Sequence, residues 1–286
     1  MSTRFTEHTP TPLFLREDGA PDAPPLLLLH GGPGAHHDYL YPQFLALAKT
    51  HRVITYDQRG GGQSRTDDPT PITWETQVHD LAAVIHELGL EAPVIVGYSW
   101  GALLAMLYAI TCLDEPSFAT PSRLVLISPA PITRVWRDEF EHALAVRQAD
   151  ASIASARRDL AASDLRATHP DAYRQRAFEL SVSGYFADPV RATALTPFRV
   201  TGKTQQSVWS SLGRYDLGQK LRGVHIPTLV VHGKQDPIPL ASARAAADAL
   251  NAQFVALDDC GHVPYVEAAD ALFAAIDSFL QTPSAD

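Results

Sequence analysis

The 286-residue sequence is poor in cysteine, and its two thiols, Cys112 and Cys260, lie far apart in the chain. Two such thiols do not form a disulfide framework, so a reducing compartment is expected. Long apolar runs are also missing, because the run from Leu26 to Leu29 is far too short to cross a bilayer. The segment Met1–Thr11 is polar and lacks the apolar core of a signal peptide. We therefore expect a cytoplasmic protein without a membrane partner.

Positive charge is scarce as well, with 23 Lys and Arg against 32 Asp and Glu and a formal net charge of −9. A nucleic-acid-binding protein normally presents a basic face, so nucleic acid is not an expected partner. The hydrophobic share of 45% and the mixed charges exclude intrinsic disorder. The length suits about two average domains or one larger α/β domain. The composition and length therefore indicate a globular protein and do not decide its oligomeric state.

The chain does contain a regular alternation of short apolar runs and helical patterns. We expect buried strands at 26–30, 52–57, 93–97, 123–128, 227–233 and 253–257, and helices at 73–88, 102–110, 242–250 and 264–280. Continuous apolar runs are typical of strands covered on both faces. Their alternation with helices predicts an α/β fold with a mostly parallel central sheet flanked by helices.

The alternation stops between Ile132 and Tyr215 and then resumes. This stretch contains helical patterns at 136–160 and 171–186, many aromatic residues, and no convincing buried strand. The simplest organisation is one core domain formed by residues 1–131 and 216–286, into which residues 132–215 are inserted as a helical cap.

The pentapeptide from Gly97 to Gly101 has the pattern G-x-S-x-G, follows an expected strand and opens an expected helix. A sharp turn between strand and helix lifts the central side chain clear of the sheet and accepts only small flanking residues. The helix N-terminus beneath it favours developing negative charge. We interpret Ser99 as a nucleophile, the alternative being a glycine-rich turn that only joins a strand to a helix.

A serine nucleophile needs a base and an acid that orients the base, in this architecture in the chain order Ser, acid, His. Asp236 follows the strand at 227–233, and His262 precedes the last helix. The loop Ser128–Pro131 after an earlier strand has no carboxylate, which favours Asp236. The pair Asp258–Asp259 is nearer to the histidine in the sequence and is the alternative acid, although we expect it to shape the turn.

Acyl transfer also needs hydrogen-bond donors for the oxyanion. The glycine-rich loop His30–Gly34 follows the first buried strand, where one donor is expected. The N–H groups of Gly32 and Trp100 are the candidates. The cluster His36–Asp38 does not have the spacing of a known metal site, and we expect neither a metal nor a cofactor.

Over nearly its full length the chain resembles the α/β hydrolases and, within them, the proline iminopeptidase group. The matching motifs are His30–Gly34, then Asp57–Gly60 with Gly62 and Ser64, and then Ser99–Gly101. The resemblance implies an α/β-hydrolase fold with an inserted helical cap. Within the second motif, Asp57 and Arg59 are expected to brace the loops behind the site.

The resemblance also implies cap carboxylates that bind the free amine of an N-terminal residue. Family members often carry a cap glutamate three residues before a Tyr-Phe pair; here the pair is Tyr185–Phe186, and Val182 stands at the glutamate's place. Glu179, one helical turn earlier, is the candidate substitute and would bind substrate together with this aromatic pair. The alternative is that Glu179, like Glu139 and Glu141, is an ordinary solvated charge.

The expected function is a serine hydrolase that uses Ser99, His262 and Asp236 through an acyl-enzyme. The resemblance favours an aminopeptidase that releases an N-terminal residue, such as proline, from a short peptide. The alternative is a carboxylesterase or lactonase acting on small-molecule esters with the same triad. An epoxide hydrolase or dehalogenase would place an aspartate at the serine's position. A non-catalytic binding protein is disfavoured because all three triad residues are present.

Overall fold

The structure, a computed structural model, describes residues 1–282 and contains one eight-stranded sheet. The strands are β1 Ser2–Phe5, β2 Phe14–Asp18, β3 Pro25–Leu29, β4 Arg52–Tyr56, β5 Val94–Tyr98, β6 Arg123–Ile127, β7 Thr228–Gly233 and β8 Gln253–Leu257. Their order in space is β1-β2-β4-β3-β5-β6-β7-β8. The β1–β2 and β2–β4 pairs are antiparallel and every other pair is parallel, which confirms a mostly parallel sheet.

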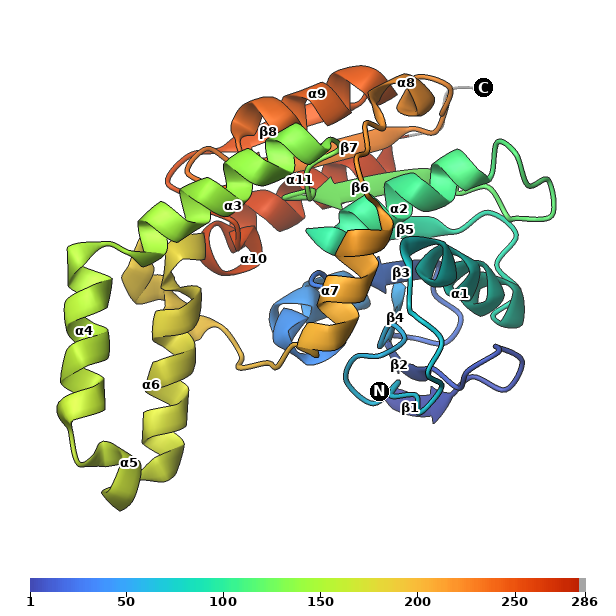
Figure 1. Ribbon diagram of the computed structural model, residues 1–286. Coiled ribbons are helices and arrows are strands. Elements are labelled where there is room, and N and C mark those ends of the chain that lie inside the picture. Colours follow the sequence, from blue (N-terminus) through green and yellow to red (C-terminus); the bar gives the residue numbers. More distant parts are fainter. Residues whose placement is uncertain (283–286) are drawn as a thin grey trace.

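Helices cover both faces of the sheet, as Figure 1 shows. The α-helices are α1 Trp74–Glu87, α2 Trp100–Thr111, α3 Arg134–Gln148, α4 Ala151–Ala162, α5 Leu165–Thr168, α6 Pro170–Val182, α7 Gly202–Ser211, α8 Gly218–Leu221, α9 Leu240–Leu250, α10 Pro264–Glu267 and α11 Ala269–Gln281. Four 3₁₀ helices complete the described secondary structure: η1 His37–Leu40, η2 Gln43–Lys49, η3 Ser183–Tyr185 and η4 Pro189–Ala194.

The central strands β3, β5 and β6 are almost entirely apolar because this part of the sheet lies between two hydrophobic cores. Alternate residues of β3 point to opposite faces, as the geometry of a strand requires. Leu27 and Leu29 join a core built with α1, α2 and α9, whereas Leu26 and Leu28 join a second core built with η2, α10 and α11. The central strands therefore have no solvent-facing side on which polar residues would alternate.

The helices α3 to α7 lie between β6 and β7 in the sequence, within the segment expected as a cap. In Figure 1, α4 and α6 extend side by side away from the sheet and are joined by α5. The chain leaves the core and returns to it at adjacent positions, where the Arg134 N–H donates to Tyr215 O and the Leu217 N–H donates to Ile132 O, each at 2.9 Å.

Three details differ from the sequence expectations. The strands β1 and β2 were not expected; every residue of β1 is exposed, so it has no apolar pattern and forms only by pairing with β2. The stretch 136–160 holds two helices, because Asp150 interrupts it and caps α4 through the N–H of Ser152. The last helical stretch is likewise two helices, α10 and α11, which meet at Ala268.

Two further observations concern single elements. Thr73 is the N-cap of α1 and accepts the N–H of Thr76 at 3.2 Å. Within residues 1–282, no helix combines the length and the apolar character that a membrane span requires.

Candidate active site

Ser99 lies in a sharp turn between β5 and α2, with φ 54° and ψ −115°. A non-glycine residue in this region of backbone conformation is strained, and surrounding structure must hold it there. The flanking glycines provide the space. A Cβ on Gly97 would lie 2.5 Å from Gly101 O, and a Cβ on Gly101 would lie 2.2 Å from Leu29 O. The G-x-S-x-G pattern is therefore explained by two backbone contacts that no side chain would permit.

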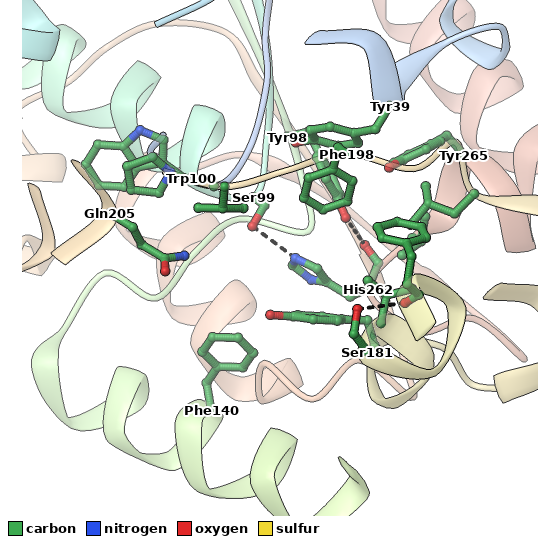
Figure 2. Close-up of a pocket in the computed structure, with 18 of the residues that line it drawn as sticks. Tyr39, Tyr98, Ser99, Trp100, Phe140, Ser181, Phe198, Gln205, His262 and Tyr265 are labelled. Carbon is green, nitrogen blue, oxygen red and sulfur yellow. Dashed lines mark hydrogen bonds between the residues drawn. The ribbon is translucent and has the colours of Figure 1, made fainter. Parts of the chain in front are cut away.

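Ser99 and the two other predicted triad residues meet at the carboxyl end of the sheet. The Nε2 atom of His262 lies 2.9 Å from Ser99 Oγ, and its Nδ1 atom lies 2.8 Å from Asp236 Oδ2. Figure 2 shows the serine hydroxyl and the imidazole pointing toward each other. Burial alone would raise the pKa of Asp236, but the adjacent His262 and His232 and the hydrogen bond from the Ile238 N–H hold that pKa below its ordinary value. The acid therefore stays ionised beside the imidazole.

The alternative acids lie elsewhere. Asp258 is at the surface, where its carboxylate pairs with Lys234 Nζ at 2.5 Å. Asp259 occupies a left-handed turn with φ 48°. Asp236, by contrast, is the carboxylate that contacts the imidazole of His262.

The imidazole is held by backbone contacts and surrounded by rings. The His262 N–H donates to Tyr185 O at 2.7 Å, and the Tyr98 hydroxyl donates to His262 O at 3.0 Å. The ring centroids of Tyr98 and Tyr185 lie 5.3 and 5.4 Å from that of the imidazole, and Phe140 from α3 lies at 6.4 Å. Core and cap segments thus both contact the histidine.

The two predicted oxyanion donors, Gly32 and Trp100, line the same cavity as Ser99. As the first residue of α2, Trp100 has an N–H without an acceptor in its own helix, at the end of the helix that favours negative charge. Gly32 has φ 61°, a conformation that glycine adopts without strain. Both residues thus lie in the wall of the cavity that contains Ser99.

The motif Asp57–Gly60 binds the segment that follows the glycine-rich loop His30–Gly34. Asp57 accepts hydrogen bonds from the backbone N–H and Nδ1 of His37, at 3.0 and 2.7 Å, and from the Gln63 N–H at 2.8 Å. Arg59 forms a two-point ion pair with the buried Asp80. The cluster His36–Asp38, considered above as a metal site, is thus partly engaged by Asp57.

Gln58, which was not among the predicted site residues, joins the two sides of the site. Its side chain donates to His30 O at 2.8 Å and accepts the indole N–H of Trp100 at 2.9 Å. Its backbone N–H donates to His30 Nε2 at 3.1 Å, and burial lowers the pKa of that imidazole to about 4. The place of Gln58 inside the motif Asp57–Gly60 was the signal available in the sequence, and the structure shows its side chain fully buried.

The cavity beside Ser99 has a volume of about 390 Å³ and a largely apolar wall. Most of its lining side chains are aromatic or aliphatic: Tyr39, Tyr98, Phe140, Phe178, Val182, Tyr185, Leu195, Phe198, Val200, Trp209 and Tyr265. Figure 2 shows Phe140 and Phe198 on two sides of the Ser99–His262 pair, with Gln205 near the serine. No carboxylate belongs to this wall in the described part of the chain.

A second cavity of about 360 Å³ also opens onto Ser99 and is more polar. Arg134, Arg137 and Glu141 from α3 contribute to its lining. The guanidinium of Arg137 lies 4.0 Å from the ring centroid of Trp209 and binds Oε1 of Glu141 through Nε and a terminal nitrogen, at 2.8 and 2.7 Å. The serine is therefore flanked by one apolar and one charged compartment.

The predicted cap residues are placed differently from one another. Glu179 is buried outside the lining of both cavities, where Arg176 and Gln175 bind its carboxylate at 2.9 and 3.0 Å. Tyr185 lines both cavities, whereas Phe186 is buried beside it. Glu139 is exposed on α3. Val182, at the place of the family's glutamate, faces the apolar cavity, so the wall is apolar at the position where that carboxylate would stand.

Sequence comparison finds curated relatives over most of the chain. A proline iminopeptidase of Lactobacillus delbrueckii subsp. bulgaricus is 29% identical over 259 residues, covering 87% of this chain and 86% of the relative. A proline iminopeptidase of Lactobacillus helveticus is 27% identical over 269 residues, covering 91% and 90% of the two chains.

Solved structures are similar over nearly the whole chain. A proline iminopeptidase of Mycobacterium smegmatis superposes with a TM-score of 0.70 at 25% identity, covering 98% of this chain and 97% of that one. The enol-lactonase of Burkholderia xenovorans LB400 superposes with a TM-score of 0.67 at 23% identity, covering 98% and 100%. The sequence model described as "Alpha/beta hydrolase family" matches residues 26–276. The chain therefore belongs to the alpha/beta hydrolase family.

Proposed function

We propose that the protein is a serine hydrolase that works through an acyl-enzyme. The observation that carries the proposal is the continuous contact from Asp236 through His262 to Ser99, at 2.8 and 2.9 Å. Ser99 Oγ attacks a carbonyl carbon while its proton passes to His262 Nε2, which then delivers the proton to the leaving group. Water attacks the acyl-enzyme by the same route in the second half-reaction.

The remaining groups have matching roles in this proposal. Asp236 keeps Nδ1 of His262 protonated and stabilises the imidazolium that forms. The N–H groups of Gly32 and Trp100 stabilise the oxyanion, a contribution of about 3 kcal/mol for one donor in comparable enzymes. No step requires a metal ion or a cofactor.

Labelling with a fluorophosphonate tests the mechanism directly. The reagent should modify wild-type protein at Ser99 and leave Ser99→Ala unmodified, because only a serine activated by a base reacts quickly. Ser163→Ala, on the exposed surface of the cap segment, is the matched control and should be labelled like the wild type. Unchanged labelling and turnover in Ser99→Ala would refute the proposal.

The substrate that the geometry supports best is a small, uncharged ester or lactone with an apolar acyl group. The support is the cavity of about 390 Å³, whose wall is aromatic and aliphatic and has Val182 where an amine-binding carboxylate is expected from the resemblance. A free ammonium placed against this wall would lose its hydration without gaining an anionic partner.

The second candidate is an aminopeptidase that releases an N-terminal residue such as proline. Glu141 favours it, because this carboxylate lines the charged cavity beside Ser99 and binds Arg137 through Oε1, which leaves Oε2 for an ammonium. The proline iminopeptidases among the relatives are further support. Glu179 has no part in this candidate, since its carboxylate binds Arg176.

A set of three chromogenic substrates separates the two candidates. An esterase or lactonase should hydrolyse short p-nitrophenyl esters and leave prolyl p-nitroanilide intact. An aminopeptidase should hydrolyse prolyl p-nitroanilide, reject its N-acetyl derivative, and lose this preference in Glu141→Gln. Equal turnover of the free and acetylated anilides would remove amine recognition from the proposal.

The proposal includes the division of the chain into a catalytic core, residues 1–131 and 216–286, and a substrate-selecting cap, residues 132–215. The two backbone hydrogen bonds between the segments Ile132–Arg134 and Tyr215–Leu217 support these boundaries, since they bring the ends of the insertion together. A cap joined at one such neck can change its sequence without displacing the strands that carry the triad.

A further inference from the structure

Glu267, at the end of α10, is an acceptor for three backbone N–H groups from two segments of the chain. Its Oε2 atom accepts from Gly261 at 2.7 Å, and its Oε1 atom accepts from Ala187 at 2.8 Å and from Asp188 at 3.3 Å. Hydrogen bonds to an ionised acceptor are about twice as strong as those between neutral groups. One partly buried carboxylate therefore joins two loops that are far apart in the sequence.

These two loops are the ones that meet at the imidazole. Gly261 directly precedes His262. Ala187 lies two residues after the cap residue Tyr185, and the carbonyl of Tyr185 accepts the His262 N–H at 2.7 Å. The loops are in direct contact, because a Cβ on Gly261 would lie 2.4 Å from Tyr185 O. The position of the histidine is thus determined jointly by its own loop and by the cap.

We propose that Glu267 is a positioning residue: it clamps the loop of His262 to the cap and so fixes the imidazole against Ser99. The inference rests on the proposed function, in which His262 is the base. Glu267 does not touch the reacting atoms, and its effect is transmitted through the Gly261 N–H and through the cap segment. A shift of the base by about 1 Å lowers turnover by roughly 100-fold in well-studied enzymes.

The two oxygens of Glu267 have separate partners, and this makes Glu267→Gln informative. Glutamine has nearly the same shape but only one acceptor oxygen, so its amide NH₂ must face either Gly261 or Ala187, both of which are donors. Whichever way the amide turns, one of the two loops loses its acceptor. We expect kcat to fall by roughly 10- to 100-fold while KM stays within about twofold, because the Glu267 side chain does not itself line the cavity.

Glu267→Asp provides a second variant that retains the charge and both oxygens. Its side chain is one methylene shorter, so the contacts lengthen without being replaced by donor–donor contacts. Its kcat should lie between those of wild type and Glu267→Gln. This graded rescue distinguishes positioning from a general loss of folded protein.

Glu87 on α1 offers a matched control, because its carboxylate also accepts backbone N–H groups, from Glu7 at 3.1 and 3.0 Å and from His8 at 2.8 Å. These partners belong to the N-terminal segment, away from the residues that line the catalytic cavity. Glu87→Gln should lower the melting temperature to a similar extent and leave kcat and KM unchanged.

The experiment measures kcat, KM, the melting temperature and the rate at which a fluorophosphonate labels Ser99, at a temperature where circular dichroism shows every variant folded. Slower labelling and lower kcat in Glu267→Gln, with normal values in Glu87→Gln, are expected. A wild-type labelling rate and wild-type kcat in Glu267→Gln would overturn the inference and leave the serine mechanism intact. Absence of labelling in wild type would instead refute the proposed function itself.

Discussion

Two helices approach Ser99, and their burial is opposite. In α2, from the core, all residues from Trp100 to Ile110 are buried, whereas α3, from the cap segment, has no fully buried residue. Each nevertheless contributes to the site: α2 begins directly after Ser99, and α3 supplies Phe140, Arg137 and Glu141 to the cavities. The helix that begins after Ser99 is packed on all sides, whereas the cap-segment helix that lines the cavities is half in solvent.

Because of this difference in burial, substitutions in the two regions should have different consequences. A change in the core must fit into close-packed surroundings, where even one extra methylene is felt. A change on α3 meets solvent on one side and is absorbed at little expense to stability. We therefore expect substitutions in the core to affect chemistry and folding, and substitutions on α3 to affect selection of substrate.

The largest expected effect belongs to Asp236→Asn. The Asn amide would donate to Nδ1 of His262 and force the proton onto Nε2, so the imidazole could no longer accept the proton of Ser99. We expect kcat to fall by about 10⁴-fold with the fold retained, as measured by steady-state kinetics and circular dichroism. Asp258→Asn, at the exposed alternative acid, should have wild-type activity. Less than a tenfold loss in Asp236→Asn would argue against the triad.

A pair of glycine substitutions compares the packing of the two regions. Gly101→Ala places a Cβ 2.2 Å from Leu29 O, whereas Gly202→Ala, at the start of α7, meets nothing within 4 Å. We expect the free energy of unfolding to fall by about 3 kcal/mol in the first variant and to rise by about 0.5 kcal/mol in the second. Urea denaturation measures both, and similar values for the two variants would remove the proposed contrast.

The stability that the buried Asp57 contributes to the core should depend on pH. Burial alone would raise its pKa, but the hydrogen bonds from His37 and Gln63 hold that pKa below 3.8. A carboxylate with a depressed folded pKa stabilises the protein above its unfolded pKa, and this stabilisation is lost as pH falls through the folded pKa. Asp57→Asn should therefore lower the free energy of unfolding by about 1–3 kcal/mol at pH 7. The difference in free energy of unfolding between this variant and the wild type should become smaller below pH 3.8.

The matched substitution in the cap segment is Asp171→Asn, which removes a solvent-exposed ion pair with Arg174 on α6. Exposed pairs of this kind contribute roughly 0.5 kcal/mol or less. Unfolding at pH 7 should hardly change. A loss as large as that in Asp57→Asn would show that the cap segment is more tightly coupled to folding than its exposure indicates.

Phe140→Ala on α3 is expected to change substrate binding and to leave stability nearly unaffected. This half-exposed ring faces the imidazole of His262 and lines both cavities. Its removal should raise KM for substrates with an apolar acyl group by roughly tenfold, about 1.4 kcal/mol, with stability and the kcat for small esters nearly unchanged. Val135→Ala, on an exposed position of the same helix, is the control. A fall in kcat alone would assign the ring a role in chemistry.

The core could be predicted from the sequence because its rules are local. A continuous apolar run identified β3 to β8, and the all-apolar stretch after Ser99 identified α2. The strand β1 gave no such signal, since its residues are all exposed and its structure depends on pairing with β2. The break at Asp150 was not predicted either. A capping residue inside a helical pattern ends one helix and begins the next, although the pattern itself continues.

Some residues of the site could be predicted from the sequence and some of its contacts could not. Motif and chain order were enough to select Ser99, Asp236 and His262, which the structure brings within hydrogen-bond distance. The partners of Glu179 and Glu267 were not predictable, because both depend on which way a side chain turns in the folded cap and its neighbouring loop. Sequence spacing placed Glu179 one helical turn from the family's position, yet that turn directs its carboxylate to Arg176 and away from the cavity.

The insertion between β6 and β7 has a consequence for how such a protein changes over time. These strands pair in parallel, with Leu124 opposite Thr228, although the whole segment from α3 to α8 lies between them. For a flexible connection, the entropy of closure grows only with the logarithm of its length, so each doubling adds about 0.6 kcal/mol. Connections of very different length therefore differ little in closure entropy, and we expect the segment 132–215 to tolerate lengthening, trimming or exchange while β6 and β7 remain in register.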